Sequence, residues 1–141
     1  MVVWADDVTR FYGNISAQGG AQSGNGGNVE VSGKSHLDFN GVADTRASNG
    51  NSGTLLLDPD SIDIVADTGS NTNITSGATF TAVGTGASTL KVGTLTTQLG
   101  LGSVTVDATG PGGFTDGAIT VSTPVTYTSG NTLTFKTPGT G

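Results

Sequence analysis

The chain is 141 residues long, carries a formal net charge of −6 and has only 11% charged residues. Gly, Thr, Ser and Asn together make up about half of it, which excludes a helical bundle, because such bundles need Ala, Leu, Glu, Lys and Arg. The few, scattered basic residues disfavour a nucleic acid or an anionic membrane as a partner. Without cysteine, the chain can form no disulfide, zinc–thiolate site or thiol nucleophile.

Short runs that alternate apolar and polar residues predict strands along the whole chain. In chain order they are residues 29–31, 37–39, 62–64, 104–106, 119–121 and 133–135. Clusters of Gly, Asn, Ser and Pro between them predict turns. No segment keeps a helical period for three turns, so we expect almost no helix.

One pattern recurs in these runs: Gly, any residue, apolar, any residue, apolar, polar. It begins at Gly27, Gly53, Gly102 and Gly117, with a weaker copy at Gly13. The interval from Gly53 to Gly102 is nearly twice that from Gly27 to Gly53, which indicates two coils of about 24 residues there. We expect the glycine to serve a sharp corner, since Gly tolerates positive φ.

A short strand with one apolar face cannot bury that face alone, but stacking on the equivalent strand of the preceding coil buries a continuous apolar column. The sequence therefore predicts an all-β fold, a parallel β-solenoid (β-helix) of roughly six to seven irregular coils, over residues 1–141 as a single segment. An immunoglobulin-like sandwich is the competing all-β architecture.

The period of two also predicts which side chains face the core. Those expected inside are Val29, Val31, Leu55, Leu57, Val104, Val106, Ile119 and Val121. Those expected outside are Glu30, Leu56, Thr105 and Thr120. Four aromatic rings are expected to stack inside the coil or to plug it: Phe11, Phe39, Phe80 and Phe135.

Several of these stretches resemble the repeats of filamentous haemagglutinin-type large exoproteins, the adhesins exported by two-partner (type V) secretion. They are residues 3–20, GGNVEVSGK at 26–34, GTLLLDPD at 53–60, GAITVS at 117–122 and TSGNTLT at 128–134. The resemblance implies a right-handed β-helix shaft of a bacterial adhesin that is secreted or held at the cell surface. The family's amino-terminal secretion domain and its signal are not visible, so we expect a fragment or module of a longer secreted protein.

Residues with catalytic potential are few. His36 is the only histidine, and because Ser35 and Asp38 flank it, a Ser-His-Asp triad is formally possible. Successive strand positions point to opposite faces, which disfavours the triad, so we interpret His36 as an exposed strand or corner residue. No nucleophile-elbow motif accompanies it. Trp4 and Tyr12 could form a carbohydrate-stacking pair, although packing in the core or at an end is the preferred interpretation.

The acidic segment from Asp58 to Asp67 is the other candidate. Asp58 and Asp60 could line a glycan-cleaving or glycan-binding cleft, and the segment could bind calcium through carboxylate oxygens. The preferred interpretation is a solvated acidic turn. No catalytic, cofactor-binding or metal-binding residue is therefore assigned, and no cofactor is expected.

The expected function is that of a non-enzymatic structural or adhesive module, extracellular or at the bacterial cell surface. Two alternatives stay open: a self-assembling filament subunit that stacks head to tail, and a carbohydrate-binding or glycan-active solenoid. Expected partners are copies of the chain end to end, with Pro138 marking where stacking stops, and host or surface glycans or proteins reached through the parent protein. Neither nucleic acid nor a membrane span is expected.

Overall fold

The computed structural model describes residues 1–68, 86–109 and 117–138. These residues form parallel strands and one helix, wound as a β-solenoid of about 4 turns. None of the described helical segments is long and apolar enough to cross a membrane.

The first two turns have the same three-strand plan. The first contains β1 (Val2–Ala5), β2 (Val8–Phe11) and β3 (Asn14–Ser16). The second contains β4 (Asn28–Gly33), β5 (His36–Phe39) and β6 (Val42–Asp44). Each strand pairs in parallel with its equivalent, β1 with β4, β2 with β5 and β3 with β6. Three faces are thus defined by the first two turns alone.

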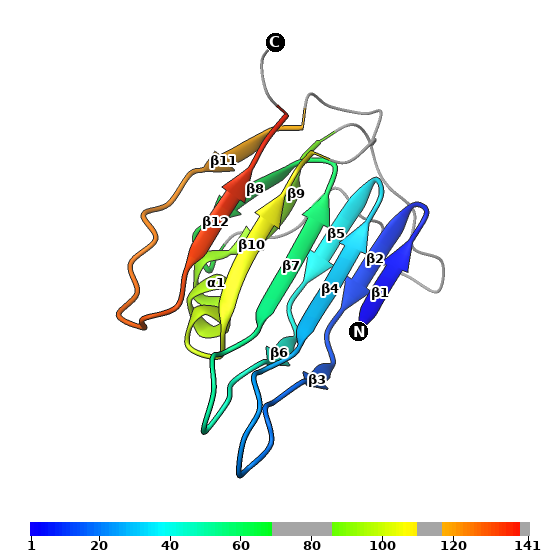
Figure 1. Cartoon of the computed structure of the whole chain (residues 1–141). Coiled ribbons are helices and arrows are strands. Elements are labelled where there is room, and N and C mark those ends of the chain that lie inside the picture. Colours follow the sequence, from blue (N-terminus) through cyan, green and yellow to red (C-terminus); the bar gives the residue numbers. More distant parts are fainter. Residues whose placement is uncertain (69–85, 110–116, 139–141) are drawn as a thin grey trace.

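The third and fourth turns depart from this plan. The third contains β7 (Thr54–Pro59), β8 (Ile62–Val65), β9 (Ser88–Lys91) and α1 (Val92–Leu99). The fourth contains β10 (Ser103–Asp107) and β11 (Ile119–Val121), and β12 (Leu133–Lys136) follows. The strand order in the largest sheet is β1-β4-β7-β10-β12, which Figure 1 shows side by side along one face.

The register of this first sheet confirms three copies of the glycine pattern. Val29 pairs with Leu55, and Leu55 pairs with Val104, so equivalent positions of the pattern stack on one another. All three side chains are buried. Because side chains alternate along a strand, this register also buries the apolar positions two residues further on.

The expectation of six to seven coils is wrong. β7 pairs directly with β10, so the interval from Gly53 to Gly102 is one enlarged turn and not two. The enlargement holds β9 and α1, neither of which belongs to the first sheet. The fourth copy of the pattern, at Gly117, was also assigned to the wrong sheet: β11 pairs with β8, and β12 takes the place beside β10.

The second face contains a strand that no other turn supplies. β9 pairs with β8, and Figure 1 shows it between β8 and β5. On the side towards β5, the backbone N–H of Leu37 donates to the hydroxyl of Ser88 over 2.9 Å. In the second face, β8 does not pair directly with β5, and β9 fills the space between these two strands.

The helix takes the place of a third-face strand. Its buried Gln98 side chain accepts a hydrogen bond from the N–H of Ala43 over 3.0 Å and donates one to the carbonyl of Gly41 over 3.3 Å. The side-chain amide thus satisfies the open edge of β6 as a peptide group of another strand would. We expected almost no helix, and α1 is the one helix among the described residues. With eight residues it is too short to show a helical period over three turns in the sequence.

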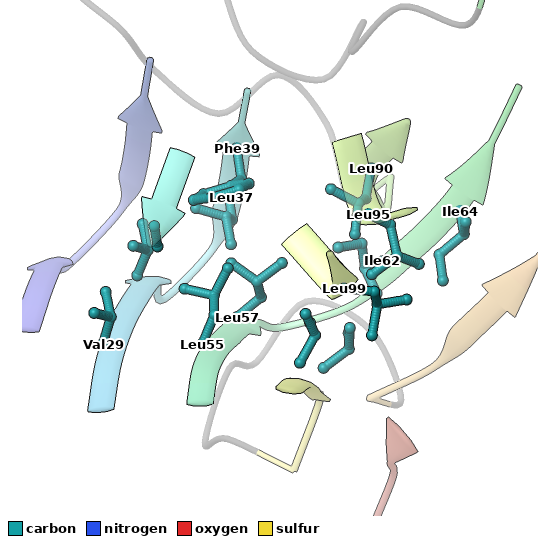
Figure 2. Packing of buried hydrophobic residues seen from close by; sticks show 14 of the residues in the cluster. Val29, Leu37, Phe39, Leu55, Leu57, Ile62, Ile64, Leu90, Leu95 and Leu99 are labelled. Carbon is teal, nitrogen blue, oxygen red and sulfur yellow. The ribbon is translucent and has the colours of Figure 1, made fainter. Parts of the chain in front are cut away.

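The core lies between these faces (Figure 2). Its largest fully buried apolar members come from β5, β7, β8, β9 and α1: Leu37, Leu55, Leu57, Ile62, Ile64, Leu90, Leu95 and Leu99. Burying each such side chain contributes about 1.5–3 kcal/mol relative to leaving it exposed. The described part of the chain is held by this apolar column and by the strand ladders.

Six of the eight predicted inward side chains are confirmed as buried, all of them on β4, β7 and β10. Ile119 is only partly buried, and Val121 is 47% exposed, so that prediction is wrong for Val121. Its strand lies at the edge of the second face, where no further described strand covers it. As predicted, Thr120 is exposed.

The prediction that four aromatic rings lie inside the coil is confirmed only in part. Phe11 and Phe39 stack with centroids 5.5 Å apart, as predicted. Phe135 is 42% exposed, which contradicts an interior position, because β12 is the last described strand of its sheet. Phe80 lies outside the described residues.

At Gly53, the glycine of the recurring pattern is needed for close approach and not for positive φ. A Cβ on Gly53 would lie 2.0 Å from the carbonyl oxygen of Gly27. Among described glycines only Gly24 and Gly117 have positive φ, so the predicted conformation is confirmed in the copy of the pattern that begins at Gly117. The expected corner role is therefore wrong for Gly53, where the backbones of successive turns touch.

Candidate functional site

A polar hollow of about 250 Å³ opens on the outer side of the second face. It is lined chiefly by six side chains from β2, β5, β9 and the residues that follow them: Arg10, Tyr12, Asp38, Asn40, Thr89 and Lys91. We refer to these six residues as the Tyr12 hollow. It combines an aromatic ring, two cations, a carboxylate, an amide and a hydroxyl.

The strand register explains why these residues meet. Arg10 pairs with Asp38 across β2 and β5, on the side opposite the buried Leu37 and Phe39. Along β9, Thr89 and Lys91 alternate with buried residues and so also point outward. Residues far apart in the sequence therefore share one outer surface.

Asp38 organises one end of the hollow. Its carboxylate accepts a hydrogen bond from the Tyr12 hydroxyl, and the Arg10 Nε lies 3.6 Å from the same Oδ2 atom. Burial and then the hydrogen bond to Asp38 raise the pKa of Tyr12, while Arg10 lowers it in part. The Tyr12 ring is 58% exposed although its hydroxyl is anchored. The ring is thus a fixed aromatic surface that faces solvent.

A second hollow of about 510 Å³ adjoins the first and shares Asn40 and Lys91 with it. Thr94 donates to Asn40 over 3.1 Å, and the N–H of Gly93 donates to Asp67 over 2.7 Å. These bonds tie the walls together across the start of α1. Because the two hollows share these two residues, we refer to the pair of hollows as the groove, with Lys91 at their junction.

The outer side of the first sheet carries a separate row of charges. Asp58 on β7 is next to Asp107 on β10 by register, and Lys136 Nζ lies 3.1 Å from Asp107 Oδ2. Burial, followed by Asp107 and Glu30, raises the pKa of Asp58 to about 6. Burial also raises the pKa of Asp107, but hydrogen bonds from Thr109 and Lys136 outweigh it, so the net pKa is lowered.

The acidic segment does not converge on one point. Asp58 is half-buried, Asp60 is 4% exposed, and Asp67 bonds to the helix. The interpretation as a solvated acidic turn is therefore wrong for Asp60. Asp60 is buried at the corner between β7 and β8, so it does not line an open cleft with Asp58. Among residues 1–68, 86–109 and 117–138 there is no group of three or more His, Cys, Asp or Glu arranged to hold a metal ion.

The sequence suggested that His36 is exposed, and this prediction is wrong, because His36 is only 1% exposed. It lies on the side of β5 opposite Leu37, and neither ring nitrogen has a hydrogen-bond partner. Ser35 is buried as well. Asp38 bonds to Tyr12 and Arg10 instead, so these three residues do not form a Ser-His-Asp arrangement.

Trp4 and Tyr12 are both more than half exposed, which contradicts the preferred packing interpretation. Trp4 pairs in register with Ser32 on the first sheet, whereas Tyr12 follows β2 on the second face. They therefore belong to different faces. The Tyr12 hollow was missed because its Lys91 comes from the inserted β9, although the alternation around Arg10 and Asp38 was readable in the sequence.

No family model, curated protein or solved structure matches this chain. The geometry described above therefore carries the functional argument.

Proposed function

We propose that this chain is a segment of the right-handed β-helical shaft of a bacterial adhesin, a non-enzymatic module exported by two-partner secretion to the cell surface or the medium. The observation that carries the proposal is the in-register stacking of the glycine pattern on β4, β7 and β10. Stacking of this kind has no intrinsic length limit, because each turn offers the next the same ladder and the same apolar column.

The fold suits a spacer that must survive outside the cell. Its backbone is tied into parallel ladders on three faces, and its core is continuous between them. A protease needs a locally unfolded segment, and ladder-bound backbone opens rarely. The similarity to filamentous haemagglutinin-type repeats supplies the surface location in this proposal.

Antibodies raised against the purified chain test the location. We expect them to label intact cells of the source bacterium or to detect the protein in the medium. A fluorescent-protein marker of the cytoplasm serves as the control for lysis. Signal found only after permeabilisation would contradict the proposal.

Head-to-tail assembly is a second candidate, favoured by the strand edges. β1, β2 and β3 each lie at an edge of their sheets at one end of the described solenoid, and β12 lies at the other edge of the first sheet. Such rows of unpaired N–H and C=O groups can accept strands of another copy, and a heterologous contact of this kind extends into a filament.

Sedimentation over a concentration series, with negative-stain microscopy, tests this candidate. Filaments that disappear when Val2 is replaced by Pro would support it, since residues 1, 3 and 5 bond to β4 and the N–H of Val2 is a donor on the free edge of β1. Ala5→Gly provides a control on the same strand that keeps its donor. A species that stays monomeric at every concentration would exclude it.

A further inference from the structure

Basic residues are scarce in this chain, yet two of them share one hollow. Of the 5 lysines and arginines, Arg10 and Lys91 both line the Tyr12 hollow. Arg46 and Lys136 are held elsewhere by Asp44 and Asp107, at 2.5 Å and 3.1 Å. Asp38, the one carboxylate that lines this hollow, offsets one of the two cations, so the hollow keeps a net positive charge in a protein whose net charge is −6 and would favour an anionic group.

Lys91 is the cation available to a ligand. Arg10 lies beside Asp38, whereas Lys91 is in no ion pair with any residue of the described part of the chain. It is half-buried at the junction of the two hollows. Its ammonium group can therefore meet an anion in either hollow, where partial burial reduces screening by salt.

Tyr12 adds a feature that a simple anion site does not need. Its ring is 58% exposed, and its hydroxyl is fixed on Asp38. A flat apolar ring of this kind stacks against the C–H face of a pyranose sugar. Because the hydrogen bond already fixes the ring, binding costs less conformational entropy. Asn40 and Thr89 stand beside it as partners for sugar hydroxyls.

We propose that the groove binds an acidic oligosaccharide built from uronic acid units. One pyranose ring stacks on Tyr12, its carboxylate pairs with Lys91, and Asn40 and Thr89 bond to ring hydroxyls. A neighbouring unit lies in the adjoining hollow, with its hydroxyls near Thr94 and Thr97 and its carboxylate directed away from Asp67. The adjoining hollow, about 510 Å³, lies within the range of about 300–1,000 Å³ that is usual for small-molecule sites, and the Tyr12 hollow, about 250 Å³, lies just below it.

The inference goes beyond the shaft proposal, because it makes this segment a receptor in its own right. It is a property of the isolated chain and does not depend on where the protein is located. Failure of the binding experiment would leave the surface-labelling result untouched, and the reverse also holds.

Isothermal titration calorimetry of the purified chain tests it directly. The probes are oligogalacturonate and hyaluronan oligosaccharides, which carry uronic acids, with neutral cello-oligosaccharide and sodium sulfate as controls. We expect binding of at least one uronate probe and little or none of the controls. Absence of binding by both uronate probes, or equal binding of the neutral one, would overturn the proposal.

Variants then locate the site. Lys91→Gln should weaken uronate binding about ten-fold or more, as expected for loss of a charge-assisted hydrogen bond, and Lys91→Arg should restore most of it. Lys34→Gln is the matched control, because Lys34 is exposed and does not line either hollow. Equal losses in Lys91→Gln and Lys34→Gln would show a general charge effect and overturn the assignment.

Tyr12 provides an independent check on the stacking. Tyr12→Phe keeps the ring and should retain more affinity than Tyr12→Ala, which removes it. Thermal melts accompany each variant, so that a loss of binding is counted only where the fold persists. If Tyr12→Ala bound as tightly as the unchanged chain, the ring would have no part in recognition and the sugar would be the wrong ligand.

Discussion

The carboxylate of Asp58 lowers the free energy of unfolding at neutral pH. It is half-buried on the outer side of β7, near Asp107 and Glu30, with a pKa of about 6. In the unfolded chain an Asp has a pKa of about 3.9. The folded state therefore binds the proton more tightly, so this residue reduces stability as the pH rises from about 4 to about 6.

We expect Asp58→Asn to raise the melting temperature above pH 6 and to have little effect at about pH 3, where the native carboxyl is largely protonated in both states. Asp6→Asn is a suitable control, because Asp6 is exposed. Thermal unfolding across this pH range provides the measurement. A gain at low pH that disappears at neutral pH would contradict the assigned direction.

His36 provides a second test at the scale of one residue. Its ring is buried, and neither nitrogen has a partner. An unsatisfied buried polar group costs about 1–3 kcal/mol, so His36→Leu should leave the free energy of unfolding unchanged or raise it. His36→Ala should lower it, because it leaves a cavity. Urea unfolding of both variants provides the comparison, and a large loss in His36→Leu would reveal a contact that the ring makes.

At the scale of the strand, neighbouring leucines on β7 have opposite roles. Leu57 is fully buried, whereas Leu56 faces outward and is only half-buried. Replacing a fully buried leucine by alanine costs about 2–5 kcal/mol. We therefore expect Leu57→Ala to cost this much and Leu56→Ala to cost far less. Denaturant unfolding of the pair measures the difference, and equal costs would show that the register is wrong by one residue.

Gln98 is the residue through which α1 meets β6. Replacing it by Leu keeps the bulk but leaves the N–H of Ala43 and the carbonyl of Gly41 without partners inside the protein. Each lost partner costs about 1–3 kcal/mol. We expect a loss of a few kcal/mol for Gln98→Leu in urea unfolding and a much smaller one for Thr97→Ala, since Thr97 is exposed. Equal effects would mean that the amide bonds contribute nothing.

For the whole molecule, the stack predicts a gradient of protection. β4, β7 and β10 are paired on both sides, whereas β1 and β12 are paired on one side only. Amide hydrogen exchange in dilute solution should therefore be slowest in β7 and faster in β1 and β12. Mass spectrometry of peptide fragments measures it. Protection of β1 and β12 that grows with protein concentration would indicate end-to-end pairing, and β1 slower than β7 in dilute solution would contradict the strand order.

The sequence by itself determined the stacking of β4 on β7 and the burial of Val29, Leu55 and Val104. These features follow from local rules, because side chains alternate with a period of two and equivalent residues of a repeat stack on one another. The parallel solenoid class followed for the same reason. Arg10 and Asp38 also lie in runs whose alternation could be read directly.

Only the tertiary structure decided which strand fills which place. β9 and α1 enter one turn, and β12, not β11, continues the first sheet. Through β9, Lys91 comes to line the same hollow as Tyr12. Such choices depend on the space left open by distant segments and on the backbone groups still lacking partners there. No local period encodes them, since the free energy of filling a gap belongs to the assembled fold and not to the segment that fills it.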